Sequence, residues 1–141
     1  VYRSQLPRAR TKSIDLTLES APGLMLTGDP DRLTQIFTNL ADNALTYTPG
    51  GGQVRLIGRA EDNGIEGIVI DNGPGIPEEE LPRVFERFYR LEKSRVRGEN
   101  GRGAGLGLAI VAELVAAHGG RISVSSEVGR GTAFVVRLPG A

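Results

Sequence analysis

Two asparagines and a threonine carry the first chemistry that this sequence suggests. Asn39, Asn43 and Thr46 are spaced at i, i+4 and i+7, so they share one face of a helix that contains them. Asparagine is a mediocre helix former, and two on one face favour contact with something outside the helix. An amide oxygen suits Mg²⁺ whose other positions hold water and phosphate oxygens. The alternative interpretation is a polar helix edge whose amides bind nothing.

A carboxylate directly follows an apolar strand in the segment Asp71-Asn72-Gly73-Pro74-Gly75-Ile76. A carboxylate at a strand end can accept a hydrogen bond from an exocyclic amine, and glycines let the backbone come close to a planar ring. The alternative interpretation of this segment is a tight turn without a ligand.

A third candidate site is the glycine-rich segment 98–107, in which five of ten residues are glycine. The segment ends where a helix is predicted to begin, and free N–H groups at a helix N-terminus bind phosphate well. It is not a Walker A loop, because no Gly-Lys-Ser/Thr follows. It is not a dinucleotide fingerprint either, because Ile110 stands where glycine or alanine is needed. The alternative is a surface loop.

Three of the seven aromatic residues, Phe85, Phe88 and Tyr89, stand just before that segment. They are suited to anchor the glycine-rich loop to the core, although ordinary helix packing also explains them. The only histidine, His118, is followed by two glycines, which indicates a cap at a helix C-terminus, where an imidazolium suits the dipole. Residues 129–132, Gly-Arg-Gly-Thr, fit a hairpin turn.

Composition excludes several other functions. The chain of 141 residues contains no cysteine, which rules out a disulfide scaffold, a cysteine zinc site and a thiol nucleophile. A single histidine argues against a protein-only His-rich metal site and against a Ser-His-Asp triad. Seventeen basic and seventeen acidic residues give no net charge, against nucleic-acid binding. No stretch reaches the roughly 18 apolar residues of a membrane span.

These residues need a scaffold of alternating strands and helices. Strands are predicted at 14–18, 24–26, 54–56, 65–71, 122–125 and 133–138, and helices at about 30–46, 78–85 and 105–118. This order predicts an α+β fold with helices on one face of a mixed sheet. Residues 1–12 carry four basic residues and no acid, and we interpret them as the end of a preceding helical or linker segment, a solvated basic terminus.

Taken together, the motifs resemble the ATP-binding catalytic domain of bacterial sensor histidine kinases, in the superfamily that also contains gyrase, MutL and a heat-shock chaperone. The resemblance covers about residues 13–139. Asn39–Tyr47 is similar to the N box, Asp71–Gly75 to the first glycine box, Phe85–Arg90 to the F box, Gly103–Leu108 to the second glycine box, and Gly129–Thr132 to the last one. The F box is the most specific, because it belongs to sensor kinases. The implied fold is the Bergerat fold: a two-layer α/β sandwich with a mixed, mostly antiparallel sheet and about three helices on one face.

The resemblance implies a role for each matching residue. Asn43 would hold Mg²⁺ that bridges the phosphates, with Asn39 supporting it. Asp71 would accept a hydrogen bond from the adenine amino group, Tyr47 would cover the adenine, and Thr132 would lie near its floor. The remaining implied ATP-binding residues are Gly73, Gly75 and Ile76 in the first glycine box, Tyr89 and Arg90 at the root of the lid, and Gly103, Ala104, Gly105, Leu106, Gly107 and Leu108 in the lid.

One position departs from the family pattern. The family often has Lys or Arg where this chain has Thr46, and that cation would meet a phosphate. Thr46 stays in the implied site, but it does not supply the cation for this phosphate contact. The lid cations Arg90, Lys93, Arg95, Arg97 and Arg102 are candidates to replace it.

The implied activity is transfer of the γ-phosphoryl of ATP to a histidine on a separate dimerisation domain. Residues 13–141 would be the catalytic domain, cytoplasmic, monomeric as a fragment, and without nucleic-acid or membrane contact. Its partners would be the dimerisation and histidine-phosphotransfer domain of the same protein and, indirectly, a response regulator.

Two alternatives remain. One is an anti-sigma-factor-type serine kinase or a related ATPase of the same fold, in which a Glu takes the place of Asn39; an amide cannot accept a proton, which disfavours it. The other is a non-catalytic module whose interactions are gated by nucleotide.

Overall fold

A five-stranded mixed sheet organises the computed structural model, which describes residues 2–20, 30–61, 64–86 and 107–139. The strands are β1 (Asp15–Ser20), β2 (Gln53–Glu61), β3 (Gly64–Asp71), β4 (Arg121–Glu127) and β5 (Gly131–Pro139), in the order β1-β2-β3-β5-β4. Only β1 and β2 are parallel among these neighbours. The sheet is therefore mixed and mostly antiparallel, as expected.

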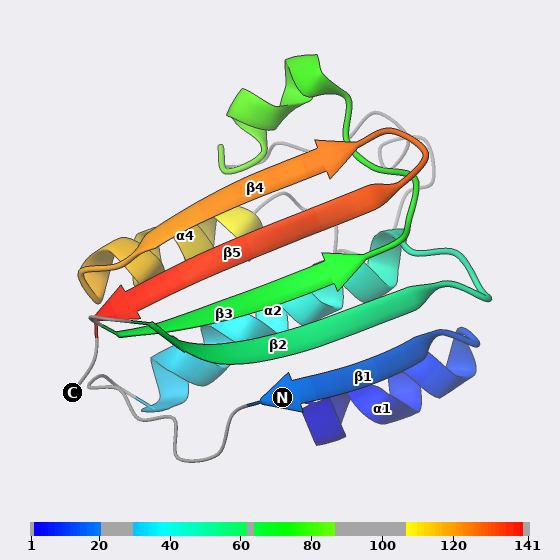
Figure 1. Ribbon diagram of the computed structural model, residues 1–141, viewed down its shortest axis with the longest axis horizontal. Helices are drawn as coiled ribbons and strands as arrows, with labels where there is room; N and C mark the ends of the chain where they lie inside the picture. Colours follow the sequence, from blue (N-terminus) through cyan, green and yellow to red (C-terminus); the bar gives the residue numbers. More distant parts are fainter. Residues whose placement is uncertain (1, 21–29, 62–63, 87–106, 140–141) are drawn as a thin grey trace.

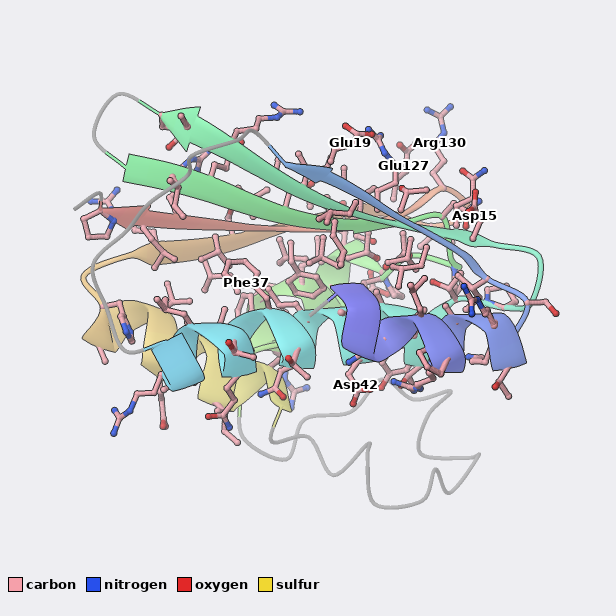
Figure 2. The ribbon with its side chains drawn as sticks, turned by 90° about the horizontal axis from the view of Figure 1, so that it is seen from below. Asp15, Glu19, Phe37, Asp42, Glu127 and Arg130 are labelled. Carbon is pink, nitrogen blue, oxygen red and sulfur yellow. The ribbon has the colours of Figure 1, made fainter. Side chains whose placement is uncertain are left out.

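Helices α1 (Tyr2–Thr11), α2 (Pro30–Tyr47) and α4 (Gly107–Ala117) cover one face of the sheet (Figure 1). Seen along the sheet, the described part of the chain forms two layers, with strands above and these helices below (Figure 2). The predicted two-layer α+β architecture is confirmed. The predicted acidic helix is a short 3₁₀ helix, η1 (Glu78–Arg83), because Pro82 cannot donate within an α-helix.

The core lies between the two layers. Helix α2 contributes side chains at i, i+4 and i+8, since Ile36, Leu40 and Ala44 are completely or almost completely buried. From the sheet, Val54, Val69 and Phe134 meet them, and Phe37 points from α2 toward the strands (Figure 2). This packing fixes which face of α2 is turned away from the sheet.

Helix α1 corrects the expectation of a solvated basic terminus. Its Ala9 is buried in the core and Gln5 is also buried. Pro7 lies in the middle of the helix, where a proline removes one i→i−4 hydrogen bond, so the contacts of α1 with the rest of the fold must offset an unfavourable residue. The basic residues suggested a solvated segment, but the segment is a helix that packs on β1 and α2.

The predicted strand at 24–26 lies outside the described residues. None of the described helices is long and apolar enough to cross a membrane.

Candidate nucleotide site

Three polar residues form a row across three neighbouring strands, at the end where β3 leaves the sheet. Asp71 on β3 is opposite Thr132 on β5, which is opposite Ser126 on β4. We call Asp71, Thr132 and Ser126 the polar row. Asp71 and Thr132 are only 8% and 7% exposed. Buried polar side chains are hydrogen-bonded in most proteins, so their partners show what the row is built to do.

The Asp71 carboxylate is held by backbone donors. Its Oδ1 accepts the N–H of Gly73 at 2.9 Å, and the backbone of Thr132 also donates to it. Burial raises the pKa of this carboxyl above its ordinary value, although the two backbone hydrogen bonds pull the pKa down. The result is a buried, fixed hydrogen-bond acceptor at a strand end, as the sequence predicts.

Two glycines bring the turns of the site into contact. A Cβ on Gly131, where φ is +127°, would lie 2.0 Å from the backbone oxygen of Asp71. A Cβ on Gly75, where φ is +80°, would lie 2.4 Å from the oxygen of Glu127. Both the conformation and the space therefore require glycine. Because of these approaches, the Asp71 turn lies directly against the β4–β5 turn, and the N–H of Gly129 donates to Pro74 at 2.9 Å.

The C-terminal end of α2 meets the same turn. A Cβ on Gly73 would lie 3.2 Å from the backbone oxygen of Tyr47 and 3.5 Å from the Cα of Thr48. Thr48 is fully buried, and its Oγ1 has no hydrogen-bond partner within the described ranges. The helix that carries the asparagines thus ends beside Asp71.

Asn39 and Asn43 are half-buried on α2. They lie at the margin of the face that packs on the sheet, where Leu40 and Ala44 are buried. Asp42, between them in sequence, extends from the side of the helix layer away from the sheet (Figure 2). The shared amide edge predicted from the spacing is consistent with this helix. No group of three or more His, Cys, Asp or Glu side chains among the described residues could hold a metal without other ligands.

A cation does stand at Thr46, but it comes from α1. Arg8 Nη2 donates to Thr46 Oγ1 at 2.6 Å, and Arg8 also pairs with the carboxylate of Asp42. Lys12 donates to the backbone oxygens of Leu45 and Thr46 at 2.6 and 3.1 Å. These bonds hold α1 against the last turn of α2. The lid cations named as replacements lie outside the described residues.

The remaining predicted site residues divide into two groups. Gly107 and Leu108 open α4, Leu108 packs against the core, and Ile76 is buried. Phe85 is in edge-to-face contact with Phe134, at 6.1 Å between ring centres, so one F-box aromatic does reach the core. Outside the described residues lie Tyr89, Arg90, Gly103, Ala104, Gly105 and Leu106.

His118 acts as the predicted cap. Its Nδ1 lies 2.8 Å from the backbone oxygen of Leu114 and, because a carbonyl can only accept, Nδ1 donates. Gly119 then turns the chain with φ of +73°.

Comparison with known proteins agrees with this geometry. The family model of histidine kinase-, DNA gyrase B- and HSP90-like ATPases matches residues 28–141. The chain belongs to this family. The predicted resemblance and the Bergerat fold are confirmed.

Within the family, similar proteins are sensor histidine kinases. The sensor protein SrrB of Staphylococcus aureus is 39% identical over 140 residues, which are 98% of this chain and 23% of SrrB. The mycobacterial sensor histidine kinase MprB is 35% identical, with a TM-score of 0.81 over 98% of this chain and 90% of that one. Full-length ShkA, solved with AMPPNP, is 37% identical, with a TM-score of 0.85 over 99% of this chain and 28% of ShkA. The chain thus spans about a quarter of the length of SrrB.

Sequence reasoning missed two residues of this region. Ser126 could have been found, because it continues the inward alternation of Ile122 and Val124 along β4. Arg8 could not, because nothing local in its segment indicates that α1 docks on α2.

Proposed function

We propose that this chain binds ATP with Mg²⁺ and donates the γ-phosphoryl to a histidine on a separate dimerisation domain, as the catalytic domain of a sensor histidine kinase. The observation that carries the proposal is the meeting of α2 with the Asp71 turn. A buried acceptor suited to an amine and a helix edge suited to phosphates and metal lie next to each other. One adenine nucleotide can use both.

The adenine end fits an amine-bearing base. Asp71 offers an acceptor fixed by Gly73 and by the Thr132 backbone. A hydrogen bond to a charged acceptor contributes about 1.5–3 kcal/mol. Thr48, whose Cα lies beside Gly73, has a buried hydroxyl without a hydrogen-bond partner among the described residues, and this supports a ligand or an ordered water in the region.

The donor set at the other end suits Mg²⁺. A half-buried amide such as Asn43 supplies one neutral oxygen, and Mg²⁺ keeps waters and phosphate oxygens in its other positions. When bound, the metal neutralises charge that develops on the phosphates. Asn39 and Thr46 extend the same edge, and Tyr47 at the helix end would lie over the base. The lid residues named above would close on the phosphates.

The phosphoryl acceptor lies on another domain in this proposal. His118 caps α4 through its Nδ1 bond to Leu114, and we place the acceptor histidine on the dimerisation domain instead. The partners are then the dimerisation and histidine-phosphotransfer domain of the same protein and, indirectly, a response regulator, with the domain cytoplasmic and monomeric. The serine-kinase alternative needs a base, and the amide of Asn39 cannot accept a proton.

Calorimetry tests the binding. The wild-type chain should bind ADP with Mg²⁺ at one site, and Asn43→Ala should lower the magnesium-dependent affinity by about tenfold or more. Gln35→Ala, exposed on the same helix, is the matched control and should change nothing. A folded wild-type chain that binds no nucleotide at millimolar concentration overturns the proposal.

Phosphotransfer tests the reaction. With labelled ATP, the chain alone should stay unlabelled, and addition of a dimerisation domain with its acceptor histidine should give acid-labile, base-stable label on that partner. Acid-stable label on the chain itself would favour the serine-kinase alternative. Nucleotide binding without any transfer would favour the nucleotide-gated module.

A further inference from the structure

Ser126 is the centre of a hydrogen-bond network that links three segments of the site. Its Oγ accepts the N–H of Ile76 at 2.7 Å, donates to the backbone oxygen of Gly131 at 2.9 Å, and lies 2.9 Å from Oγ1 of Thr132. Ile76 belongs to the Asp71 turn, Gly131 and Thr132 to β5, and Ser126 to β4. The Ser126 hydroxyl can therefore determine in which direction the Thr132 hydroxyl, opposite Asp71, points its proton.

Only one assignment of protons lets Ser126 keep all three of these bonds. A carbonyl only accepts, so the single proton of Ser126 goes to Gly131. The N–H of Ile76 takes one lone pair of Ser126 Oγ. The second lone pair faces Thr132, and Thr132 must donate to it. With its proton turned toward Ser126, the Thr132 hydroxyl offers only lone pairs to its other neighbours.

The Asp71 carboxylate, when ionised, also only accepts. Asp71 and Thr132 are directly opposite each other on adjacent strands, and the Thr132 backbone donates to Asp71. Two acceptors thus lie together at one end of the site. An amino group has two N–H donors and can serve both acceptors, whereas a carbonyl oxygen at the same position is repelled by both.

We propose that Ser126 is a positioning and specificity-determining residue, which turns the Thr132 hydroxyl into an acceptor and thereby selects 6-amino purines over 6-oxo purines. The inference rests on the proposed binding of adenine nucleotides and goes beyond it, because it assigns the discrimination to a residue of β4 that is itself one hydrogen bond away from the ligand.

The direct test compares ADP with inosine diphosphate (IDP), in which an oxo group replaces the 6-amino group of the base. Calorimetry in Mg²⁺ gives the two Kd values for each variant. Ser126→Ala frees Thr132 to donate, so the ratio of IDP to ADP Kd should fall about fivefold. Ser126→Thr keeps a hydroxyl and should retain the wild-type ratio. Ser125→Ala, exposed on the opposite face of β4, is the matched control.

A purely structural role for Ser126 would weaken both nucleotides equally, and an unchanged ratio in folded Ser126→Ala overturns the inference. Thr132→Val provides an independent measurement if Ser126→Ala does not fold, because it keeps the bonds of Ser126 to Ile76 and Gly131. It should lower the ratio by a similar factor, and adding Ser126→Ala to it should have no further effect on the ratio. The inference about Ser126 is also overturned if Thr132→Val leaves the ratio of IDP to ADP Kd unchanged. The same holds if the ratio falls further in the double variant.

The two proposals fail in different ways. Absence of wild-type binding to both nucleotides removes the proposed function and this inference together. Wild-type binding of ADP with a ratio that Ser126→Ala leaves unchanged removes this inference alone.

Discussion

The base end and the phosphate end of the proposed site are built differently. The base end is a corner of three strands, where Asp71, Thr132 and Ser126 are joined by short hydrogen bonds to backbone or to one another. The phosphate end is one edge of α2, with α1 bound to its last turn through Arg8 and Lys12. The base end depends on residues brought together from distant parts of the sequence, whereas the phosphate end depends on helical spacing. Damage to the first should therefore spread through the sheet, and damage to the second should stay local.

The largest expected effect is at the base end. Gly131→Ala places a Cβ 2.0 Å from the Asp71 backbone, so β5 must move away from β3. We expect the free energy of unfolding to fall by about 3 kcal/mol or more, which lowers Tm by roughly 10 °C. Thermal unfolding measures it.

Gly129→Ala is the matched control for that variant. Gly129 also has a positive φ, +86°, but nothing lies within 4 Å of its added Cβ. Only the unfavourable backbone conformation should then lower the free energy of unfolding, by about 1 kcal/mol. Equal losses for the two variants would mean that the close approach of β5 to Asp71 contributes nothing.

A smaller effect is expected where α1 supports the phosphate end. Arg8→Ala removes the bonds to Thr46 and Asp42 from a side chain that is only partly exposed. The free energy of unfolding should fall by about 1 kcal/mol, or roughly 3 °C in Tm. Arg10→Ala, exposed on the same helix, should have almost no effect. If both variants behave alike, the α1–α2 contact is not held by Arg8.

The smallest effect concerns the cost of burying the Asp71 charge without nucleotide. Because burial raises its pKa in the folded chain, the folded state binds a proton more readily than the unfolded state. The stability that the folded state gains by binding this proton is complete when the pH is below the ordinary pKa of 3.8. It is lost as the pH rises through the raised pKa of the folded state. At pH 7 the Tm of Asp71→Asn should therefore be higher than that of wild type by roughly 2 °C. The variant should nevertheless bind ADP more weakly.

Thermal unfolding of both proteins from pH 4 to pH 7 checks this sign. The advantage of Asp71→Asn should shrink toward pH 4, where the wild-type carboxyl becomes protonated. Asp15→Asn, exposed on β1, is the control. An advantage that grows toward low pH contradicts the direction of the Asp71 shift.

Local sequence patterns were sufficient for the elements that carry strong periodicity. The helix predicted from Pro30 to about Thr46 is α2, and the strands predicted at 65–71 and 133–138 are β3 and β5. The face that Asn39 and Asn43 share also follows from spacing alone. The position of Asp71 at a strand end was predictable, because an apolar run and a glycine turn bracket it.

The missed features depend on tertiary contacts. Helix α1 buries small or polar side chains, Ala9 and Gln5, so its segment has no apolar stripe to recognise. The inward position of Ser126 follows from the alternation along β4, but its hydrogen bonds to Thr132 and Ile76 do not. The parallel pairing of β1 with β2 likewise depends on the path of the whole chain.

The parallel pairing of β1 with β2 also determines where this chain can be cut. Recombinant fragments are often trimmed to a family match, which begins here at residue 28. Such trimming would remove α1 and β1, and with them Ile14 and Leu16 from the core. Strand β2 would become a nine-residue edge with unpaired backbone groups, a surface that invites strand-to-strand aggregation between molecules. We therefore expect the first twenty residues to protect the edge of β2, and a fragment that starts at 28 should precipitate more readily than the 141-residue chain.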